Sequence, residues 1–233
     1  MSPSTLSAAF EEARALDAPL SERLGAYARS LRAFRPDFAE AVDRLVARLR
    51  EGTLVAGAPK EGDAMPAFLL PDHAGRLVAL DELVAQGPVA VTFARGHWCP
   101  YCRIAVSSLA DVADDIRDAG AQVVVIVPDR QQYAAKLKAD AHAPFSILTD
   151  LDNGYAMSLG LVFWVGEELQ RLMQSRGISP QESQGNESCF VPVPATFIVG
   201  RDGRIAARHV DPDYRKRMEM DAVVAALKAA AGA

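Results

Sequence analysis

Residues 89–102 read VAVTFARGHWCPYC, and they join a run of apolar residues to a pair of cysteines. The run from Val89 to Phe93 is short and rich in β-branched residues, which predicts a buried β-strand. From Pro100 onward, apolar residues recur at helical spacing as far as Ile116, and proline is favoured in the first turn of a helix. We therefore expect a strand, a loop and a helix, with Cys99 and Cys102 where the helix begins.

A Cys-x-x-Cys at the start of a helix favours redox chemistry. Unpaired backbone N–H groups and the positive end of the helix dipole stabilise a thiolate, which lowers the cysteine pKa from about 8.5 toward the ~3.5–7.5 range. The spacing places the second sulfur within one turn, where it can resolve a mixed disulfide or a sulfenic acid on the first. We expect Cys99 and Cys102 to cycle between dithiol and disulfide.

Two alternatives for the cysteine pair stay open. The thiols could be inert, or they could belong to a structural zinc site. Tetrahedral zinc needs four ligands, and only isolated residues could complete such a set: Cys189, His97, His142 and His209. We expect no metal and no other cofactor.

Residues beside the pair are candidates for supporting roles. A protonated His97 would add positive charge, and Trp98 would shield the sulfurs from water; a solvated histidine and a simple packing role are the alternatives. Pro100 stiffens the first helical turn. Arg95 and Tyr101 complete the expected surroundings of the sulfurs.

Farther along the chain, short apolar strands alternate with helices, which predicts an α/β sheet with helices on both faces. The expected strands include 122–127 and 145–148, and the segments 196–199 and 205–209 are expected to form an antiparallel hairpin at the sheet edge. Pro194 stands directly before this hairpin, so it marks the first residue of a strand or a special turn, of which a cis bond is one kind. Cys189 lies in a polar stretch and is expected to be exposed.

The chain before this region is expected to be helical. The clearest helix begins at Pro36, repeats apolar residues at 3.6-residue spacing and stops near Gly52. A second helix is expected after a Ser21 cap, and a first around Phe10. The turn-rich residues 57–63 suggest a boundary, which divides the chain into a helical extension, 1–58, and an α/β domain, 59–233. We expect the extension to be an appendage or a homodimer contact without a part in the chemistry.

Composition excludes several classes of function. The 233 residues include 25 Lys and Arg and 30 Asp and Glu, for a formal charge of −5, and half are hydrophobic. Such a chain can bury a core, and its mild acidity does not suit nucleic acid or an anionic membrane. Without a recognisable leader or membrane span, and with three cysteines, we expect a cytoplasmic protein.

From Gly62 onward the chain resembles the peroxiredoxin-like (alkyl hydroperoxide reductase / thiol-specific antioxidant) branch of the thioredoxin-fold superfamily. The similarity is carried by the entry segment 62–68, the strand 89–93, and the segments 145–150 and 195–199. It implies a thioredoxin-like fold, with a central mixed sheet and helices on both faces, and an antioxidant activity. Residues 1–58 lie outside it.

The site departs from the family signature, Pro-x-x-x-Thr-x-x-Cys with a distant arginine. Cys102 takes the peroxidatic position, but Cys99 stands in place of the threonine, Arg95 in place of the proline and Pro194 in place of the arginine. Trp98 with Cys-Pro-Tyr-Cys, facing Pro194, is similar instead to thioredoxin and glutaredoxin sites. Thioredoxin chemistry would use Cys99 as the attacking sulfur, and peroxiredoxin chemistry would use Cys102.

The expected function is therefore a thiol-dependent redox enzyme. Its substrate would be a hydroperoxide or a disulfide, and a thioredoxin-like protein or a small thiol would reduce it again. The alternative is a non-enzymatic interaction module built on a thioredoxin fold.

Overall fold

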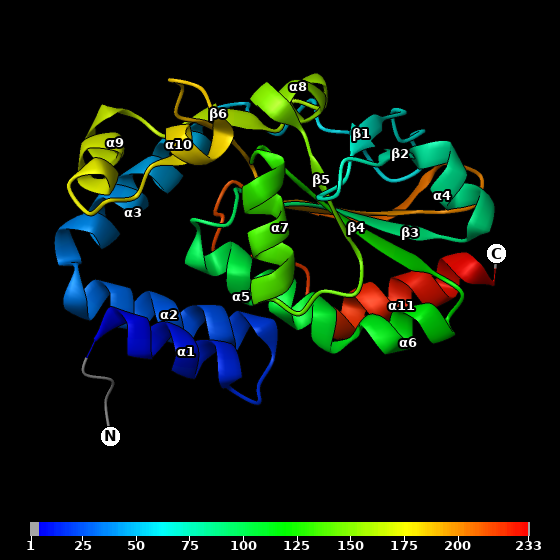
Figure 1. Cartoon of the computed structure of the whole chain (residues 1–233), viewed down its shortest axis with the longest axis horizontal. Coiled ribbons are helices and arrows are strands. Elements are labelled where there is room, and N and C mark those ends of the chain that lie inside the picture. Colours follow the sequence, from blue (N-terminus) through cyan, green and yellow to red (C-terminus); the bar gives the residue numbers. More distant parts are fainter. Residues whose placement is uncertain (1–4, 233) are drawn as a thin grey trace.

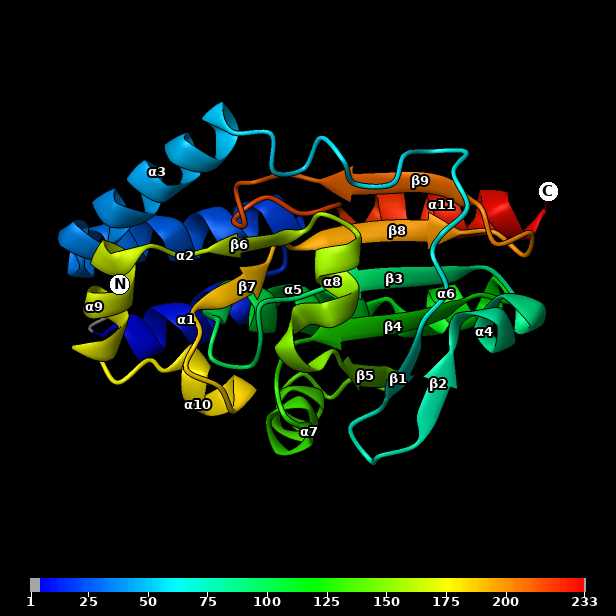
Figure 2. The same ribbon diagram turned by 90° about the horizontal axis from the view of Figure 1, so that it is seen from above.

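A five-stranded mixed sheet forms the centre of the molecule, with the strand order β5-β4-β3-β8-β9 (Figure 2). The computed structural model describes residues 5–232. Strands β3, β4 and β5 run parallel, whereas β8 is antiparallel to both of its neighbours. The bounds are β3 (Val89–Phe93), β4 (Gln122–Val127), β5 (Ser146–Thr149), β8 (Ala195–Val199) and β9 (Ile205–Val210). This arrangement confirms the predicted fold class.

Helices cover both faces of the sheet (Figure 1). Helices α6 (Ala113–Asp118) and α11 (Met220–Ala231) lie on one face. On the other lie the β1–β2 hairpin, α4 and α8, with bounds β1 (Leu69–Pro71), β2 (Leu77–Ala79), α4 (Leu80–Gln86) and α8 (Gly154–Ser158). Helix α7 (Gln131–Asp140) packs along β5. The residues of β3 and β8 are all buried as a result.

The cysteine motif lies between β3 and α5 (Pro100–Asp111), as predicted. The predicted helix continues less far than expected, because Val112 leaves helical geometry (φ −106°, ψ 10°) and a separate helix, α6, follows. The N-terminal, positive end of α5 lies at the same end of the sheet as the C-terminal end of β3.

Strand β8 lies inside the sheet, between β3 and β9, so the expectation of an edge position is wrong for β8 and holds only for β9. Pro194 directly precedes β8, where the missing N–H leaves the ladder intact. No peptide bond within residues 5–232 is cis, so Pro194 is trans.

The sequence pattern predicted no elements between residues 160 and 192. The structure forms a second hairpin there, from β6 (Val162–Trp164) and β7 (Phe190–Pro192), with α9 (Glu167–Gln174) and α10 (Pro180–Gln184) between the strands. A short 3₁₀ turn, η1 (Leu151–Asn153), precedes α8.

Three helices precede the sheet: α1 (Leu6–Ala15), α2 (Leu20–Phe34) and α3 (Pro36–Glu51). Pro36 begins α3 as predicted. Ser21 does not cap α2; instead the Glu219 carboxylate accepts hydrogen bonds from the backbone N–H groups of Leu20 and Ser21, both at 2.9 Å. Helices α1 and α2 lie against α5, and α3 packs against α9 (Figure 2). Among the described helices, none is long and apolar enough to cross a membrane.

Candidate active site

Three strand ends bring the site together. The loop 94–99 follows β3, Pro194 precedes the antiparallel β8, and residues 211–219, here called the C-terminal segment, follow β9. Thr92 pairs with Thr196, and Ala195 pairs with Val210. The C-terminal ends of β3 and β9 and the N-terminal end of β8 therefore lie at the same end of the sheet, where the three segments meet.

Both cysteines are reduced and almost fully buried, with 1% of each residue exposed. Cys99 is the N-cap residue of α5, and its carbonyl accepts hydrogen bonds from the backbone N–H groups of Cys102 and Arg103. The sulfur of Cys102 accepts a hydrogen bond from the backbone N–H of Arg95 at 3.3 Å. The pair thus lies under the surface, at the positive end of the helix dipole.

The two thiols have opposite pKa shifts. Burial by itself raises the pKa of Cys99, but the hydrogen bond from the Cys102 thiol and the charges of Arg95 and Arg217 outweigh it, and the pKa falls to about 6. Burial raises the pKa of Cys102 well above its usual value, and so does the hydrogen bond that its thiol gives to Cys99. The surroundings of the pair therefore favour the thiolate form at Cys99 and disfavour it at Cys102.

Two arginines supply the positive charge near the sulfurs. The Arg95 guanidinium is buried between two aromatic rings, 3.8 Å from the centre of Tyr214 and 4.7 Å from that of Trp98. Arg217, in the C-terminal segment, places Nη2 3.8 Å from the Cys102 sulfur. Burial and the nearby charge of Arg103 lower the pKa of His97, which disfavours the protonated form of this side chain.

Asp129 holds the loop between β3 and α5. This fully buried carboxylate accepts a hydrogen bond from the His97 backbone N–H at 2.7 Å, and its Oδ1 has no partner. Gly96 has φ +122°, and a Cβ there would lie 2.5 Å from Asp129 Oδ1, so the close approach requires glycine. Burial raises the pKa of Asp129 to about 6, although the His97 N–H opposes the shift.

The other predicted supporting residues lie at or near the pair. Pro100 begins α5, and Trp98 is half-buried beside Arg95. Tyr101 is buried between the rings of Tyr27 and Tyr214, with centroid distances of 5.1 and 5.5 Å.

Cys189 is buried and not exposed as expected, with 3% of the residue accessible. It precedes β7, and the Gln181 amide of α10 donates to its sulfur at 2.8 Å. Burial raises the pKa of this thiol. The polar stretch 183–188 misled the prediction, because polar residues in it, Ser183 and Gln184, are themselves buried.

Sequence reasoning missed Asp129, Tyr214 and Arg217. A signal for Asp129 was present, since it follows the predicted strand 122–127, whose end adjoins the end of the strand 89–93 in a parallel pair. The C-terminal segment has no periodic pattern, and nothing in its sequence connects Arg217 to Cys102.

An apolar cavity of about 220 Å³, here called the Cys99 cavity, reaches Cys99 but not Cys102. Its walls come from α2, α3 and the residues after α9, as well as from the cysteine loop. The lining residues are Leu6, Tyr27, Leu31, Arg35, Phe38, Arg95, Trp98, Cys99, Pro100, Tyr101, Arg176, Ile178 and Tyr214. Residues of the N-terminal helices therefore line the same cavity as Cys99.

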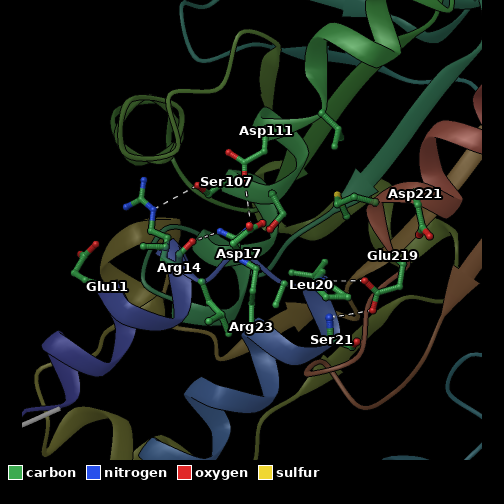
Figure 3. Close-up of a pocket in the computed structure, with 17 residues that line it drawn as sticks. Glu11, Arg14, Asp17, Leu20, Ser21, Arg23, Ser107, Asp111, Glu219 and Asp221 are labelled. Carbon is green, nitrogen blue, oxygen red and sulfur yellow. Dashed lines mark hydrogen bonds and ion pairs between the residues drawn. The ribbon is translucent and has the colours of Figure 1, made fainter. Parts of the chain in front are cut away.

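A larger cleft, of about 940 Å³, lies between the α1–α2 hairpin, α5 and the start of α11 (Figure 3). No cysteine lines it. Arg23 pairs with Asp111 across it, and Glu219 reaches the start of α2. The contacts across this cleft thus attach the N-terminal helices to the rest of the fold, and the cleft does not include the cysteine site.

Known proteins share this architecture. A model of the AhpC/TSA family matches residues 62–208. Peroxiredoxin Bcp of Escherichia coli (strain K12) is 27% identical over 169 residues, which cover 72% of this chain and 96% of that protein. Peroxiredoxin Q, chloroplastic, of Oryza sativa subsp. japonica is 31% identical over 100 residues, 43% of this chain and 46% of that protein. The crystal structure of peroxidoxin BcpB from Mycobacterium tuberculosis shares the fold, with a TM-score of 0.57 and 22% identity over 73% of this chain and 97% of that chain.

Proposed function

Because the chain belongs to the AhpC/TSA family and is a thiol-dependent redox enzyme of the peroxiredoxin type, we propose that it reduces hydroperoxides with Cys99 as the attacking thiolate and Cys102 as the resolving thiol. The observation that carries this assignment is the access to the sulfurs. The Cys99 cavity ends at Cys99, whose pKa is about 6, whereas Cys102 lies outside the cavity and its pKa is raised.

The reaction has two steps within the protein. The Cys99 thiolate attacks the terminal oxygen of the hydroperoxide, the O–O bond breaks, and the alcohol leaves with the proton of the hydroperoxide, so that Cys99 becomes a sulfenate. The Cys102 thiol then attacks the protonated sulfenic acid, water leaves, and a Cys99–Cys102 disulfide forms. An external dithiol, from a thioredoxin-like protein, or a small thiol of a reducing compartment restores both cysteines.

The two arginines take the place of the family's missing groups. The leaving alkoxide carries developing negative charge, and positioned donors that stabilise such charge are worth a few kcal/mol each. Arg95 and Arg217 lie beside the sulfurs although Pro194 occupies the position of the family's arginine. This arrangement supports peroxide chemistry in spite of the altered signature.

Single serine variants test the order of the sulfurs. With hydrogen peroxide and dithiothreitol, Cys99→Ser is expected to consume no peroxide, because it lacks the thiolate. Cys102→Ser is expected to form a sulfenic acid on Cys99, detected by dimedone labelling and mass spectrometry, and Cys189→Ser is the matched control that keeps the parent rate.

The family resemblance makes the opposite assignment, with Cys102 as the peroxidatic sulfur. A Cys99→Ser variant that consumes peroxide at the parent rate and carries the sulfenic acid on Cys102 would establish that assignment instead. If the parent enzyme does not react with peroxide but reduces a protein disulfide through Cys99, its activity is thioredoxin-like disulfide exchange and not peroxide reduction.

A further inference from the structure

Arg95 is a buried cation. Only 3% of the residue is exposed, and its guanidinium lies between the rings of Tyr214 and Trp98. Two of its nitrogens, Nε and Nη1, have no hydrogen-bond partner within residues 5–232. An arginine side chain stays protonated in proteins, so the fold has to accommodate a full positive charge at this position.

No carboxylate neutralises this charge. Within residues 5–232, Arg95 forms no ion pair with an aspartate or a glutamate. The acidic groups whose charges act on it are the thiols of Cys99 and Cys102 and the phenol of Tyr214. Burial raises the pKa of Tyr214 above its ordinary value of 10, which keeps the phenol neutral. The cysteine pair is therefore the source of the anion that Arg95 needs.

Arg103 of α5 shows a different arrangement. It also lies against an aromatic ring, with its guanidinium 4.3 Å from the centre of Phe10. Its Nε and Nη2, however, donate to the Asp140 carboxylate at 2.7 and 2.8 Å. Loss of the negative charge at Cys99 therefore leaves Arg103 neutralised. The same loss leaves Arg95 as a buried cation without an anion, which is a strongly destabilising arrangement.

Formation of the Cys99–Cys102 disulfide removes this anion. The two sulfurs give up two electrons together with their protons, and neither can then carry a negative charge. The dithiol state can thus neutralise Arg95, and the disulfide state cannot. A protein disulfide is a strong oxidant when the fold stabilises its reduced form.

We propose that Arg95 makes the Cys99–Cys102 disulfide a strong oxidant, which weakly reducing thiols suffice to reduce, and that the protein is more stable as the dithiol than as the disulfide. The proposal rests on the disulfide of the proposed function, and it holds whichever oxidant forms that disulfide. Arg95 stands in place of the proline of the family signature, so the signature itself does not supply this cation.

Reduction of the disulfide returns the anion to Arg95. A thiolate of the reductant attacks the Cys99 sulfur, which the cavity reaches, the S–S bond breaks, and Cys102 leaves and takes up a proton. A second thiolate then attacks the reductant's sulfur in the mixed disulfide, and Cys99 leaves as a thiolate beside Arg95. Two electrons pass to the protein, and the reductant becomes a disulfide.

Equilibration in glutathione buffers measures the oxidising strength without peroxide. In a Cys189→Ser background, alkylation and mass spectrometry give the fractions of dithiol and disulfide. At about pH 7, Arg95→Met should shift the equilibrium about tenfold toward the disulfide, or about 30 mV, because the pKa of Cys99 returns from about 6 toward 9. Arg217→Met should shift it less in the same direction, and Arg103→Met, the matched control, should keep the parent constant.

The pH dependence assigns the effect to Cys99. The constant for oxidation by glutathione disulfide should be flat below about pH 6 and should fall about tenfold per pH unit above it, because Cys99 ionises only in the dithiol state. In Arg95→Met the fall should begin at a higher pH. The pKa of Asp129 is also about 6, so Asp129→Asn is the control, and it should keep the fall near pH 6.

Stability gives a second readout. A crosslink between residues three positions apart closes a very short loop, so it constrains the unfolded chain little. Urea unfolding of the parent should therefore give a lower midpoint for the disulfide form than for the dithiol form. In Arg95→Met this difference between the two forms should disappear.

A folded Arg95→Met variant with the parent constant and the parent pH profile would overturn the inference, and so would a parent that is more stable as the disulfide. If this variant does not fold, as judged by circular dichroism, the pH profile and the two midpoints of the parent decide. Absence of any Cys99–Cys102 disulfide in the buffers would overturn the proposed function as well. A disulfide with the expected constant in a protein that reduces no peroxide would contradict only the peroxidase activity.

Discussion

Residues 62–208, which the family model matches, and the residues on either side of them contribute different parts of the active site. The matched part holds both cysteines and Arg95, which β3, the loop and α5 position. The flanking parts hold Arg217 beside the sulfurs and the walls of the Cys99 cavity on α2 and α3. Elements outside the family's sheet thus contribute part of the charge near the sulfur pair and part of the cavity that leads to it.

The largest effect should come from Arg95, in the matched part. Arg95→Met removes the charge that lowers the pKa of Cys99 and the buried donors beside it, so we expect the peroxide rate constant at neutral pH to fall about a hundredfold. The rate of Cys99 alkylation by iodoacetamide should rise with pH through about 6 in the parent and at higher pH in the variant. Coincident pH profiles would show that another group stabilises the thiolate.

Asp129, also in the matched part, should make stability depend on pH. Its pKa in the fold, about 6, lies above the ordinary 3.8, so its contribution is fully present below about pH 4 and is lost as the pH rises through about 6. The loss is on the order of 3 kcal/mol. Urea unfolding at about pH 4 and about pH 8 should show a smaller difference in Asp129→Asn than in the parent.

The exposed Asp118 provides the control for this measurement. Asp118→Asn should keep the parent difference between the two pH values. An Asp129→Asn variant with the same pH dependence as the parent would mean that the buried carboxylate does not lose stability by ionising.

Arg217 tests whether the flanking part tunes the nucleophile. Arg217→Met should raise the pKa of Cys99 and lower the peroxide rate constant about tenfold, less than Arg95→Met, because its charge contributes less to that pKa. The neighbouring Lys216→Met removes an exposed charge and should leave the rate constant unchanged. Equal rates in Arg217→Met and in the parent would show that only charges in the matched part affect the reactivity of Cys99.

The smallest effect concerns the attachment of the N-terminal helices. Glu219→Ala leaves two N–H groups at the start of α2 without their acceptor, which should lower the free energy of unfolding by about 1 kcal/mol. Glu12→Ala on the exposed side of α1 is the control. Identical urea midpoints for both variants would show that the carboxylate does not act as a cap.

Local pattern predicted the elements whose apolar residues repeat regularly. Strands β3 and β4 and helix α3 lie where the pattern placed them, because a buried strand or an amphipathic helix is encoded within a few neighbouring residues. The prediction failed for residues 160–192, because the strands there have three residues each and the helices have five and eight. Elements this short are stabilised by tertiary contacts more than by their own sequence.

The sequence by itself determined the reactive group: a Cys-x-x-Cys between a strand and a helix, with the helix dipole at its thiols. Only the tertiary structure decided how the surroundings of the two sulfurs differ, what charges face them and which of them a cavity reaches. Arg217 and Cys102 are 115 positions apart, and the walls contributed by α2 precede Cys99 by more than sixty residues. Burial and Coulomb energies depend on distances through space, and those distances exist only once the helices and the C-terminal segment have packed around the end of the sheet.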